Sequence, residues 1–498
     1  MDTAQELELL IRSKYPIIYL ETWEEERAEN LLKVIAAKSG KHLFIWTSTR
    51  GLYRSDIQEP IYNTIQPLNA LSHIYCSTQT ALYLLKDFHQ HLTDPVVTRK
   101  LKDISKIFEE TDGCIIISAP EVKIPTELSR TAVHLELMLP SGDELKKVII
   151  EAIRELKDKA HIYIGITLDE LNQMTERLKG LTLNEAKRTI YQAILQDNKL
   201  TREDLHQVLE AKREIIEKGS VLEFYYCEDT LPSVGGMEQL KSWLSKRKKA
   251  FSKKAKKFGL EPPRGILIIG VLGCGKSLMA KAVARDWDLP LLKLDAGKIY
   301  DKYIGESEKN LRQALRITGS MAPVVLWIDE IEKGFSYSQF SEADSGLSKR
   351  IFGTLLTWLQ EKKKMVFVVA TSNDIFSLPP ELLRKGRFDE IFFVDLPNYQ
   401  ERRAIFTIHL KKRNRNLEDF DINLLAEKTR GFSGAEIEQV IISALYNAFS
   451  GSGNLTTELL IEEIENTRPL SVIKKEKIDK LRSWAKGRTI PAGQDFNS

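Results

Sequence analysis

The sequence predicts an α/β protein whose carboxyl-terminal half is a three-layer sandwich, built on a parallel sheet and followed by a helical lid. From about residue 228 onward, short apolar runs of strand length alternate with amphipathic helical stretches. Such alternation is typical of a parallel sheet with helices on both faces. After Pro397 the strand pattern stops, and residues 398–467 read as helices joined by Gly and Asn turns. The predicted strands are residues 265–269, 291–295, 324–329, 365–371 and 391–395.

The amino-terminal half repeats this plan in weaker form. Residues 16–47 follow the same strand, turn, helix and strand order as residues 264–295, and residues 113–140 follow 365–397. The turns GLTLNEA and GFSGAEI recur at matching places, which favours a duplication over the general rhythm of two unrelated α/β domains. The predicted domains are an α/β copy at 1–144, its lid at 145–220, an α/β domain at 228–397, its lid at 398–467 and a tail at 468–498.

Composition indicates a soluble globular chain with no strong charge preference. The 498 residues suffice for about two or three domains. Hydrophobic residues make up 42% and charged residues 29%, and 73 Lys and Arg stand against 70 Asp and Glu. No apolar stretch approaches the roughly 20 residues of a membrane span, and the amino terminus MDTAQELELL lacks the order of a secretion signal. Four widely spaced cysteines offer no CxxC pair, which fits a reducing compartment.

Lysine and arginine cluster at residues 246–257, just before the carboxyl-terminal sheet. We interpret this run as a solvated helix face, because the net charge of the chain is near neutral and the basic clusters at 246–249 and 253–257 contain no aromatic residue to stack on bases. Binding of nucleic acid or of an acidic partner stays open as the alternative.

The segment GVLGCGKS at residues 270–277 has the composition of a phosphate-binding loop. Its glycines let the backbone amides wrap a phosphate, and Lys276 offers a cation to the β and γ phosphates. Ser277 supplies a hydroxyl for Mg²⁺, and the helix that begins there turns its positive end toward the anion. The segment follows the strand GILII and opens the helix SLMAKAVA, as this mechanism requires. We therefore predict a P-loop nucleotide-binding fold that takes ATP and Mg²⁺.

The strand VVLWIDE at residues 324–330 supplies the second half of the predicted site. Asp329 is placed to hold Mg²⁺ through water, and Glu330 to polarise the attacking water. In the amino-terminal copy the turn after the first strand reads ETWEEE at residues 21–26, with no glycine and no lysine. Four carboxylates there repel phosphate, so this copy is predicted to be a degenerate ATPase-like domain with a scaffolding or docking role.

Several further segments of residues 228–467 resemble the AAA ATPases. TSND at 371–374 is similar to the family's sensor 1, which implies that Asn373 orients the attacking water. LLRKGRFDE at 382–390 is similar to the arginine-finger segment, which implies that Arg384 and Arg387 reach the nucleotide of a neighbouring subunit. The resemblance therefore implies a homo-oligomeric ring, most often a hexamer. The nucleotide contacts that it implies are Val234, Gly235, Gly270, Val271, Leu272, Gly273, Cys274, Gly275, Lys276, Ser277, Leu278, His409, Gly434 and Ala435.

DKYIGESEKNLR at residues 301–312 resembles the family's first pore loop. The resemblance implies that Tyr303 and Ile304 project into the channel of the ring and grip a polypeptide. The glycine-flanked polar loop at 334–346 is a candidate second pore loop.

Two features depart from the common family pattern. Cys274 stands beside the predicted phosphates, where we favour a tolerated small residue over a redox switch. The amino-terminal half replaces the β-rich adaptor domains of better-known remodellers. The whole layout, with its ending RPLSVIKKEKIDKLRSWAKGRTIPA, resembles the hypothetical-reading-frame branch of the family from cyanobacteria and algal plastids.

From these observations we predict a ring-forming ATPase that remodels or threads a protein client in cyanobacterial cytoplasm or plastid stroma. A nucleotide-dependent switch that binds its partner through residues 1–220 is one alternative, and a nucleic-acid-dependent ATPase is another. A built-in protease is disfavoured, because the sequence holds no HExxH zinc motif.

Overall fold

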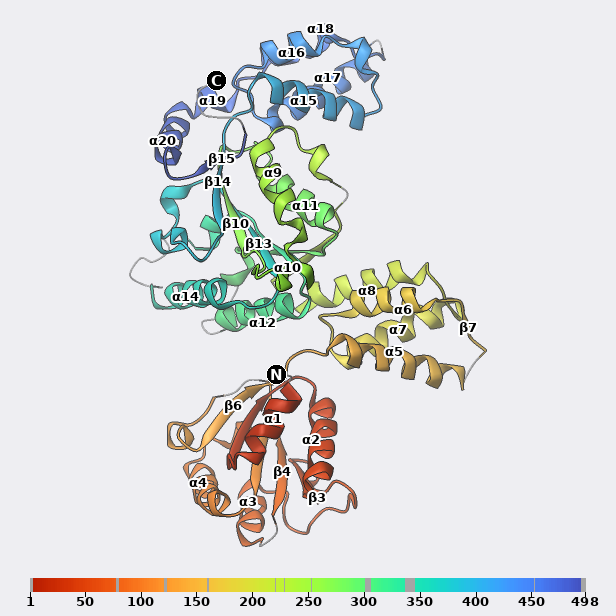
Figure 1. Ribbon diagram of the computed structural model, residues 1–498, viewed down its shortest axis with the longest axis vertical. Coiled ribbons are helices and arrows are strands. Elements are labelled where there is room, and N and C mark those ends of the chain that lie inside the picture. Colours follow the sequence, from red (N-terminus) through yellow and green to blue (C-terminus); the bar gives the residue numbers. More distant parts are fainter. Residues whose placement is uncertain are drawn as a thin grey trace. The chain divides into compact units, whose positions relative to one another are not determined.

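The chain divides into two compact units, Met1–Leu205 and His206–Ser498, and the boundary falls inside helix α8 (Asp204–Gly219) (Figure 1). We describe each unit by itself. The computed structural model describes residues 3–77, 80–120, 123–158, 161–219, 221–227, 229–251, 253–300, 306–335, 345–451 and 453–493. None of the helices in these ranges is long and apolar enough to cross a bilayer.

Unit 1 opens with a six-stranded sheet in the order β3-β2-β4-β5-β1-β6. All neighbours are parallel except the antiparallel pair β2 and β3. The central strand β5 reads CIIISA and is buried at every position, as expected for a strand covered on both faces. The strands are β1 Ile17–Glu21, β2 His42–Thr47, β3 Gly51–Arg54, β4 Ala81–Lys86, β5 Cys114–Ala119 and β6 Ala132–Glu136.

Helices cover both faces of this sheet. Apolar residues of α1 and α2 pack on one face, and those of α3 and α4 pack on the other. The bounds of these helices are α1 Thr3–Arg12, α2 Glu25–Ser39, α3 Pro67–Cys76 and α4 Pro95–Glu110.

A small helical lid completes unit 1. Its helices begin with capping boxes at Ser141, Thr167 and Thr182, which satisfy amides that the first helical turn leaves free. The elements are α5 Gly142–Lys157, α6 Leu168–Leu178, α7 Leu183–Asp197 and the short pair β7 Tyr163–Ile164 and β8 Lys199–Leu200.

Unit 2 holds a seven-stranded sheet in the order β15-β14-β10-β13-β12-β11-β9. Each strand predicted from the sequence appears within one residue of its expected bounds. Only β9 is antiparallel, and it pairs with the edge of β11. The strands are β9 Leu222–Tyr225, β10 Gly265–Gly270, β11 Leu291–Leu294, β12 Val324–Ile328, β13 Val366–Ser372, β14 Glu390–Val394 and β15 Ile490–Pro491.

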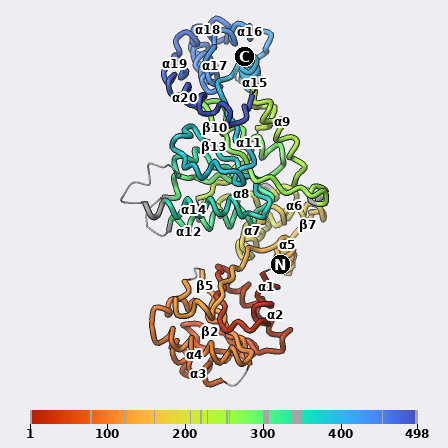
Figure 2. Tube along the Cα trace, turned by 60° about the vertical axis from the view of Figure 1, so that its left-hand side comes forward, coloured from red at the N-terminus to blue at the C-terminus, as the bar shows by residue number. Residues whose placement is uncertain are grey.

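The sheet of unit 2 is the middle layer of three. Helices α9 and α11 contribute apolar side chains to one face, and α12 and α14 contribute to the other. Figure 2 shows α12 and α14 on one side of β10 and β13, and α9 on the opposite side. The predicted three-layer sandwich is thus confirmed. The helices of this part are α9 Glu238–Arg247, α10 Lys253–Lys257, α11 Lys276–Trp287, α12 Glu306–Ser320, α13 Ile331–Gly334 and α14 Ser345–Glu361.

The two sheets share one strand order. If the parallel strands of each are counted along the chain, and the short edge strand β15 is left out, both run 5-1-4-3-2 across the sheet, and an antiparallel strand follows strand 2. The weaker amino-terminal copy of the plan is therefore a true α/β domain of the same topology. This shared order supports the predicted duplication.

A four-helix lid and a returning segment close unit 2. The lid is α15 Tyr399–Lys412, α16 Ile422–Lys428, α17 Gly434–Ser450 and α18 Thr457–Asn466. Beyond it, the predicted tail forms α19 Leu470–Ile473 and α20 Lys475–Ala485 before β15 joins the sheet edge. Sequence patterns did not indicate β15, because two residues are too short to show any alternation. The domain boundaries drawn from the sequence stay predictions.

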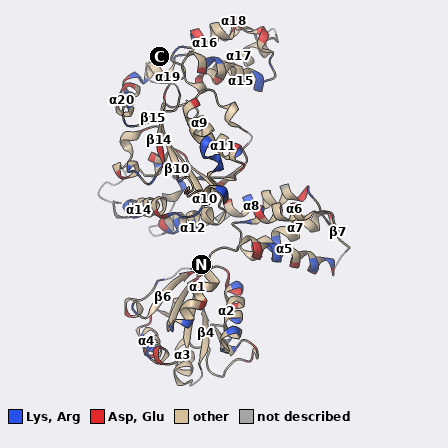
Figure 3. Ribbon diagram, in the orientation of Figure 1, with Lys and Arg blue, Asp and Glu red and all other residues tan. Residues whose placement is uncertain are grey.

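Charged side chains of both signs are interspersed over the helices of each unit (Figure 3). Within the basic run, Lys248 forms an ion pair with Asp286 at 3.4 Å. The Arg247 guanidinium lies 3.6 Å from the centre of the Trp243 ring. These contacts agree with our interpretation of the run as a surface helix face.

Candidate functional site

The phosphate loop lies between β10 and α11 and depends on glycine at two close approaches. Gly270 has φ +156°, and a Cβ there would meet the carbonyl oxygen of Val394 at 2.0 Å. Gly273 has φ +77°, and a Cβ there would meet Ser433 Oγ at 2.9 Å. The Gly273 carbonyl accepts a hydrogen bond of 2.9 Å from the Ala435 amide at the start of α17. The loop therefore contacts both the neighbouring strand and the lid.

Lys276 folds back onto this loop. Its Nζ donates to the carbonyl oxygens of Gly270 at 2.9 Å and Val271 at 2.7 Å. The side chain is buried, and burial lowers the pKa of Lys276 to about 8. A desolvated ammonium whose hydrogen bonds, within the described residues, go to carbonyl oxygens is well placed to gain from an anion.

The metal-ligating pair predicted from the sequence meets in the structure. Ser277 Oγ donates to Asp329 Oδ1 at 3.0 Å, and Thr371 Oγ1 donates to the same oxygen at 2.7 Å. Thr371 also accepts from the Glu330 amide at 3.1 Å, so one hydroxyl holds both acids at the end of β12. A hydroxyl and a carboxylate side by side are oxygen donors of the kind that Mg²⁺ takes.

Glu330 and Asn373 also come together. Asn373 Nδ2 donates to Glu330 Oε1 at 3.1 Å, and Lys333 Nζ lies 2.5 Å from Glu330 Oε2. Glu330 has φ +47° and ψ +54°, a left-handed backbone that is costly for a residue with a side chain. Strain of this kind gathers at functional sites, and here it directs the carboxylate toward Asn373.

One cavity of about 1160 Å³ collects most of the predicted site residues. It runs from the acids of β12, past the phosphate loop, to the lid helices α15 and α17. The His409 imidazole lines it from α15, and burial lowers the pKa of His409. The predicted residues that line it are Val234, Gly235, Leu272, Gly273, Cys274, Gly275, Lys276, Ser277, Leu278, Asp329, Glu330, Asn373, His409, Gly434 and Ala435.

Cys274 is buried in this loop, and burial raises the pKa of its thiol to about 12. A thiol with so high a pKa stays protonated and reacts slowly with oxidants. This environment supports a tolerated small residue over a redox switch.

Arg384 and Arg387 are not among the described residues that line the cavity. Arg387 Nη1 is buried and has no hydrogen-bond partner within the described part of the chain. Burial, with Arg384 nearby, lowers the pKa of Arg387. A guanidinium nitrogen without a partner is suited to an anion that this unit does not itself supply.

The segment that carries these arginines is anchored to the start of β10. Asp389 Oδ2 accepts from the amides of Arg264 at 2.7 Å and Gly265 at 2.9 Å. The Arg264 guanidinium in turn donates to the Gly386 carbonyl oxygen at 2.9 Å. The strand that leads into the phosphate loop therefore also holds the arginine segment. The predicted pore residues Tyr303 and Ile304, and residues 336–344 of the loop 334–346, lie outside the described residues.

Sequence reasoning missed several residues of the site, among them Thr371, Asp395, Arg482 and Lys486. Thr371 lies in the segment that resembles sensor 1. No sequence pattern indicated that its hydroxyl hydrogen-bonds to both the Asp329 carboxylate and the Glu330 amide. Asp395 follows β14, while Arg482 and Lys486 come from the predicted tail, and all three line the cavity. No motif links positions so far apart in the chain.

The fold and this site define a P-loop ATPase domain with a helical lid. The family model described as "ATPase family associated with various cellular activities (AAA)" matches residues 266–396, and "AAA+ lid domain" matches 419–458. In unit 1, "SpoVK-like AAA ATPase, N-terminal domain" matches residues 3–137. The model "SpoVK-like AAA ATPase, second domain" matches residues 143–219.

Relatives extend this match over nearly the whole chain. An "Uncharacterized AAA domain-containing protein ycf46" from Pyropia yezoensis is 41% identical over 97% of this chain and 98% of its own length. The protein of the same name from Guillardia theta is 39% identical over 98% of this chain and 96% of its own. A proteasome-activating nucleotidase from Saccharolobus solfataricus is 34% identical over 46% of this chain and 58% of its own. The chain belongs to the AAA ATPase family and, within it, to the ycf46 proteins, which confirms the predicted resemblance.

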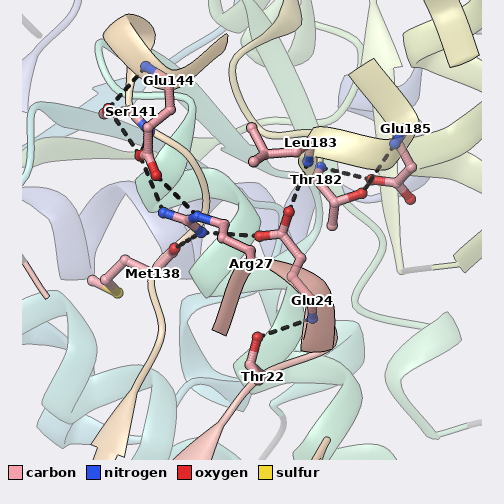
Figure 4. Close-up of polar contacts among 9 residues, drawn as sticks. All are labelled: Thr22, Glu24, Arg27, Met138, Ser141, Glu144, Thr182, Leu183 and Glu185. Atoms are coloured by element: carbon pink, nitrogen blue, oxygen red, sulfur yellow. Dashed lines mark hydrogen bonds and ion pairs between the residues drawn. The ribbon is translucent and has the colours of Figure 1, made fainter. Parts of the chain in front are cut away.

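The corresponding turn of unit 1 is filled by its own side chains (Figure 4). Glu24 follows β1, where unit 2 has its phosphate loop. Its Oε1 accepts a hydrogen bond of 2.7 Å from the Leu183 amide at the start of α7. The opposite oxygen, Oε2, accepts from Arg27 Nη1 at 2.9 Å. Arg27 also forms a two-pronged pair with Glu144, at 3.0 and 3.1 Å.

These contacts correct one detail of the sequence interpretation. The four carboxylates of the turn do not point together into an empty phosphate site, because Glu24 is turned inward onto the lid. Burial raises the pKa of Glu24, while the Leu183 amide and Arg27 act to lower it. An internal carboxylate thus binds the lid helix of unit 1 at the turn where unit 2 has the phosphate loop.

We predict that Glu24→Ala loosens the lid of unit 1. The substitution removes the acceptor of the half-buried Leu183 amide and one partner of Arg27, at a cost of about 1–3 kcal/mol. Hydrogen exchange on the full-length chain should show faster exchange at Leu183 and Asn184, and Glu24→Gln should show a smaller effect. The exposed Glu26→Ala is the matched control. Unchanged exchange in Glu24→Ala would contradict this account.

Proposed function

We propose that this chain binds Mg²⁺ and ATP in the cavity of unit 2 and hydrolyses ATP as part of a homo-oligomeric ring, a hexamer. The observation that carries the proposal is the meeting of Lys276, Ser277, Asp329, Glu330 and Asn373 at one cavity. Their positions were predicted from separate motifs of the chain, and a chance meeting would be hard to explain.

Each side chain has a chemical task in this proposal. Lys276 turns from the loop carbonyls to the β and γ phosphates, and the loop amides hold the remaining phosphate oxygens. Ser277 and Asp329 hold Mg²⁺, which neutralises charge on the phosphates. Glu330 accepts a hydrogen bond from the attacking water, and Asn373 fixes the direction of its carboxylate. Val234, Gly235 and His409 line the end of the cavity that would take the adenine and ribose.

The site is completed by a neighbouring subunit. Arg384 and Arg387 do not line the cavity of their own unit in the described part of the chain, and Arg387 keeps a buried, unpartnered nitrogen. A guanidinium that enters from the next subunit would neutralise charge that develops in the transition state. Rings are typical of the AAA family, which supports this arrangement.

The work done by hydrolysis is, in this proposal, the threading of a protein client past Tyr303 and Ile304. The pore-loop resemblance of residues 301–312 supports it, as does kinship with a protein named as a proteasome-activating nucleotidase. Unit 1 serves as a scaffold or docking domain. Kinship with proteins of Pyropia yezoensis and Guillardia theta supports the predicted compartment, plastid stroma or cyanobacterial cytoplasm.

Glu330→Gln tests the hydrolytic site. We expect phosphate release to fall by about 100-fold or more, because the amide cannot accept a proton from water. ATP affinity, measured with a fluorescent analogue, should stay within about threefold of the wild type. The exposed Glu361→Gln serves as control, and undiminished hydrolysis in Glu330→Gln would remove Glu330 from this role.

A mixture of two inactive variants tests the shared site. Arg387→Ala lacks the finger, and Lys276→Ala lacks the phosphate contact, so each alone should hydrolyse at least about 100-fold more slowly. In a mixed ring, an intact phosphate loop meets an intact Arg387 wherever a Lys276→Ala subunit donates to an Arg387→Ala subunit. Mixing should therefore restore part of the activity. No restoration, or full activity of Arg387→Ala alone, would contradict completion in trans.

Tyr303→Ala tests threading. We expect basal hydrolysis to stay within about twofold of the wild type, while stimulation by a permanently unfolded protein is lost. Tyr303→Phe, which keeps the ring, should retain the stimulation. Equal stimulation of Tyr303→Ala and wild type would rule out a grip at this position.

A further inference from the structure

The segment that follows the lid of unit 2 returns to the α/β domain and is held there. Strand β15 pairs in parallel with β14, and Ala492 donates its amide to the Phe393 carbonyl oxygen at 2.8 Å. The Ala492 carbonyl oxygen accepts from the amides of Gln239 at 3.0 Å and Leu240 at 3.1 Å, at the start of α9. Leu481 and Ala485 of α20 are buried in the core of the domain. This segment is an integral part of unit 2.

Its position brings it to the nucleotide cavity. Seven of its residues line the cavity, and the lid model ends at residue 458, so the family models assign nothing to them. They are Ser471, Arg482, Ser483, Lys486, Pro491, Ala492 and Gly493.

Asp395 places a negative charge beside the phosphate loop. It follows β14, and the Val394 carbonyl oxygen accepts a hydrogen bond of 2.9 Å from the Val271 amide of that loop. Asp395 also contributes, after burial, to the raised pKa of Cys274. A free carboxylate so close to the loop would repel the phosphates of ATP.

Arg482 of α20 forms a bidentate ion pair with this carboxylate through two nitrogen atoms of its guanidinium. Nε lies 2.8 Å from Oδ2 and 3.0 Å from Oδ1 of Asp395, and Nη2 lies 2.8 Å from Oδ1. The hydrogen bonds to Asp395 raise the pKa of Arg482 further above its usual value, so the guanidinium stays charged. A two-pronged pair is the geometry in which arginine neutralises a carboxylate most effectively.

We propose that residues 470–493 form one wall of the nucleotide site and that Arg482 is a positioning residue, which neutralises Asp395 so that the phosphate loop accepts ATP. The inference rests on the proposed binding of ATP at this cavity. It adds that the ion pair between Asp395 and Arg482 makes the affinity for ATP depend on the returning segment.

The test is a charge-rescue series on the full-length chain, with ATP affinity measured by titration of a fluorescent analogue. Arg482→Met should weaken ATP binding by about tenfold, because the Asp395 charge is left free. The double variant Arg482→Met with Asp395→Asn should bind within about threefold of the wild type. The deficit of Arg482→Met should also shrink between 50 mM and 500 mM salt, by screening.

Arg488→Met, on the same segment but exposed and away from the cavity, is the matched control. Thermal melts establish that each variant is folded. Wild-type affinity in Arg482→Met would overturn the inference, and so would a deficit that Asp395→Asn does not rescue. If the wild-type chain fails to bind ATP at all, that result contradicts the proposed function and not the role of Arg482. The two proposals can therefore fail in distinguishable ways.

Discussion

The structure of each unit depends on which groups neutralise negative charge at the turn that follows β1 in unit 1 and β10 in unit 2. In unit 2 this turn is a loop of backbone amides with a buried lysine, and each nearby carboxylate already has a donor. Asp329 is held by Ser277 and Thr371, Glu330 by Asn373 and Lys333, and Asp395 by Arg482. The backbone amides of the phosphate loop therefore remain available to bind an anionic ligand.

In unit 1 the negative charge at this turn is also compensated by groups of the same unit. The start of its lid helix receives the Glu24 carboxylate, and Arg27 balances the charge against Glu144. Because this anion is covalently part of the chain, the turn holds a carboxylate in the absence of any ligand. The two units share the order of their parallel strands and differ in what occupies this turn, a carboxylate of the chain in unit 1 and a phosphate loop in unit 2.

Local patterns in the sequence were sufficient for five of the seven strands of unit 2 and for the main site, but not for the strands β9 and β15. The strand GILII, the glycine loop and the helix after it are adjacent in sequence, so the residues dictate both the turn and its chemistry. The acid pair after VVLWI could be placed as well, since parallel strands end at one edge of the sheet. The tie between Glu24 and Leu183, and that between Asp395 and Arg482, join positions far apart, and each is formed by ordinary charged or backbone groups. Only packing in three dimensions distinguishes these from the many other acids and bases of the surface.

The returning segment has a consequence for the order in which the protein acquires its properties during synthesis. Arg482 emerges about 200 residues after the phosphate loop, which at about 5–20 residues per second is a delay of roughly 10–40 s. Until then the nascent domain has its loop and its lid, yet Asp395 is uncompensated and one wall of the cavity is open. If the segment governs ATP affinity as proposed, a partly made chain binds the nucleotide about tenfold more weakly than the finished chain.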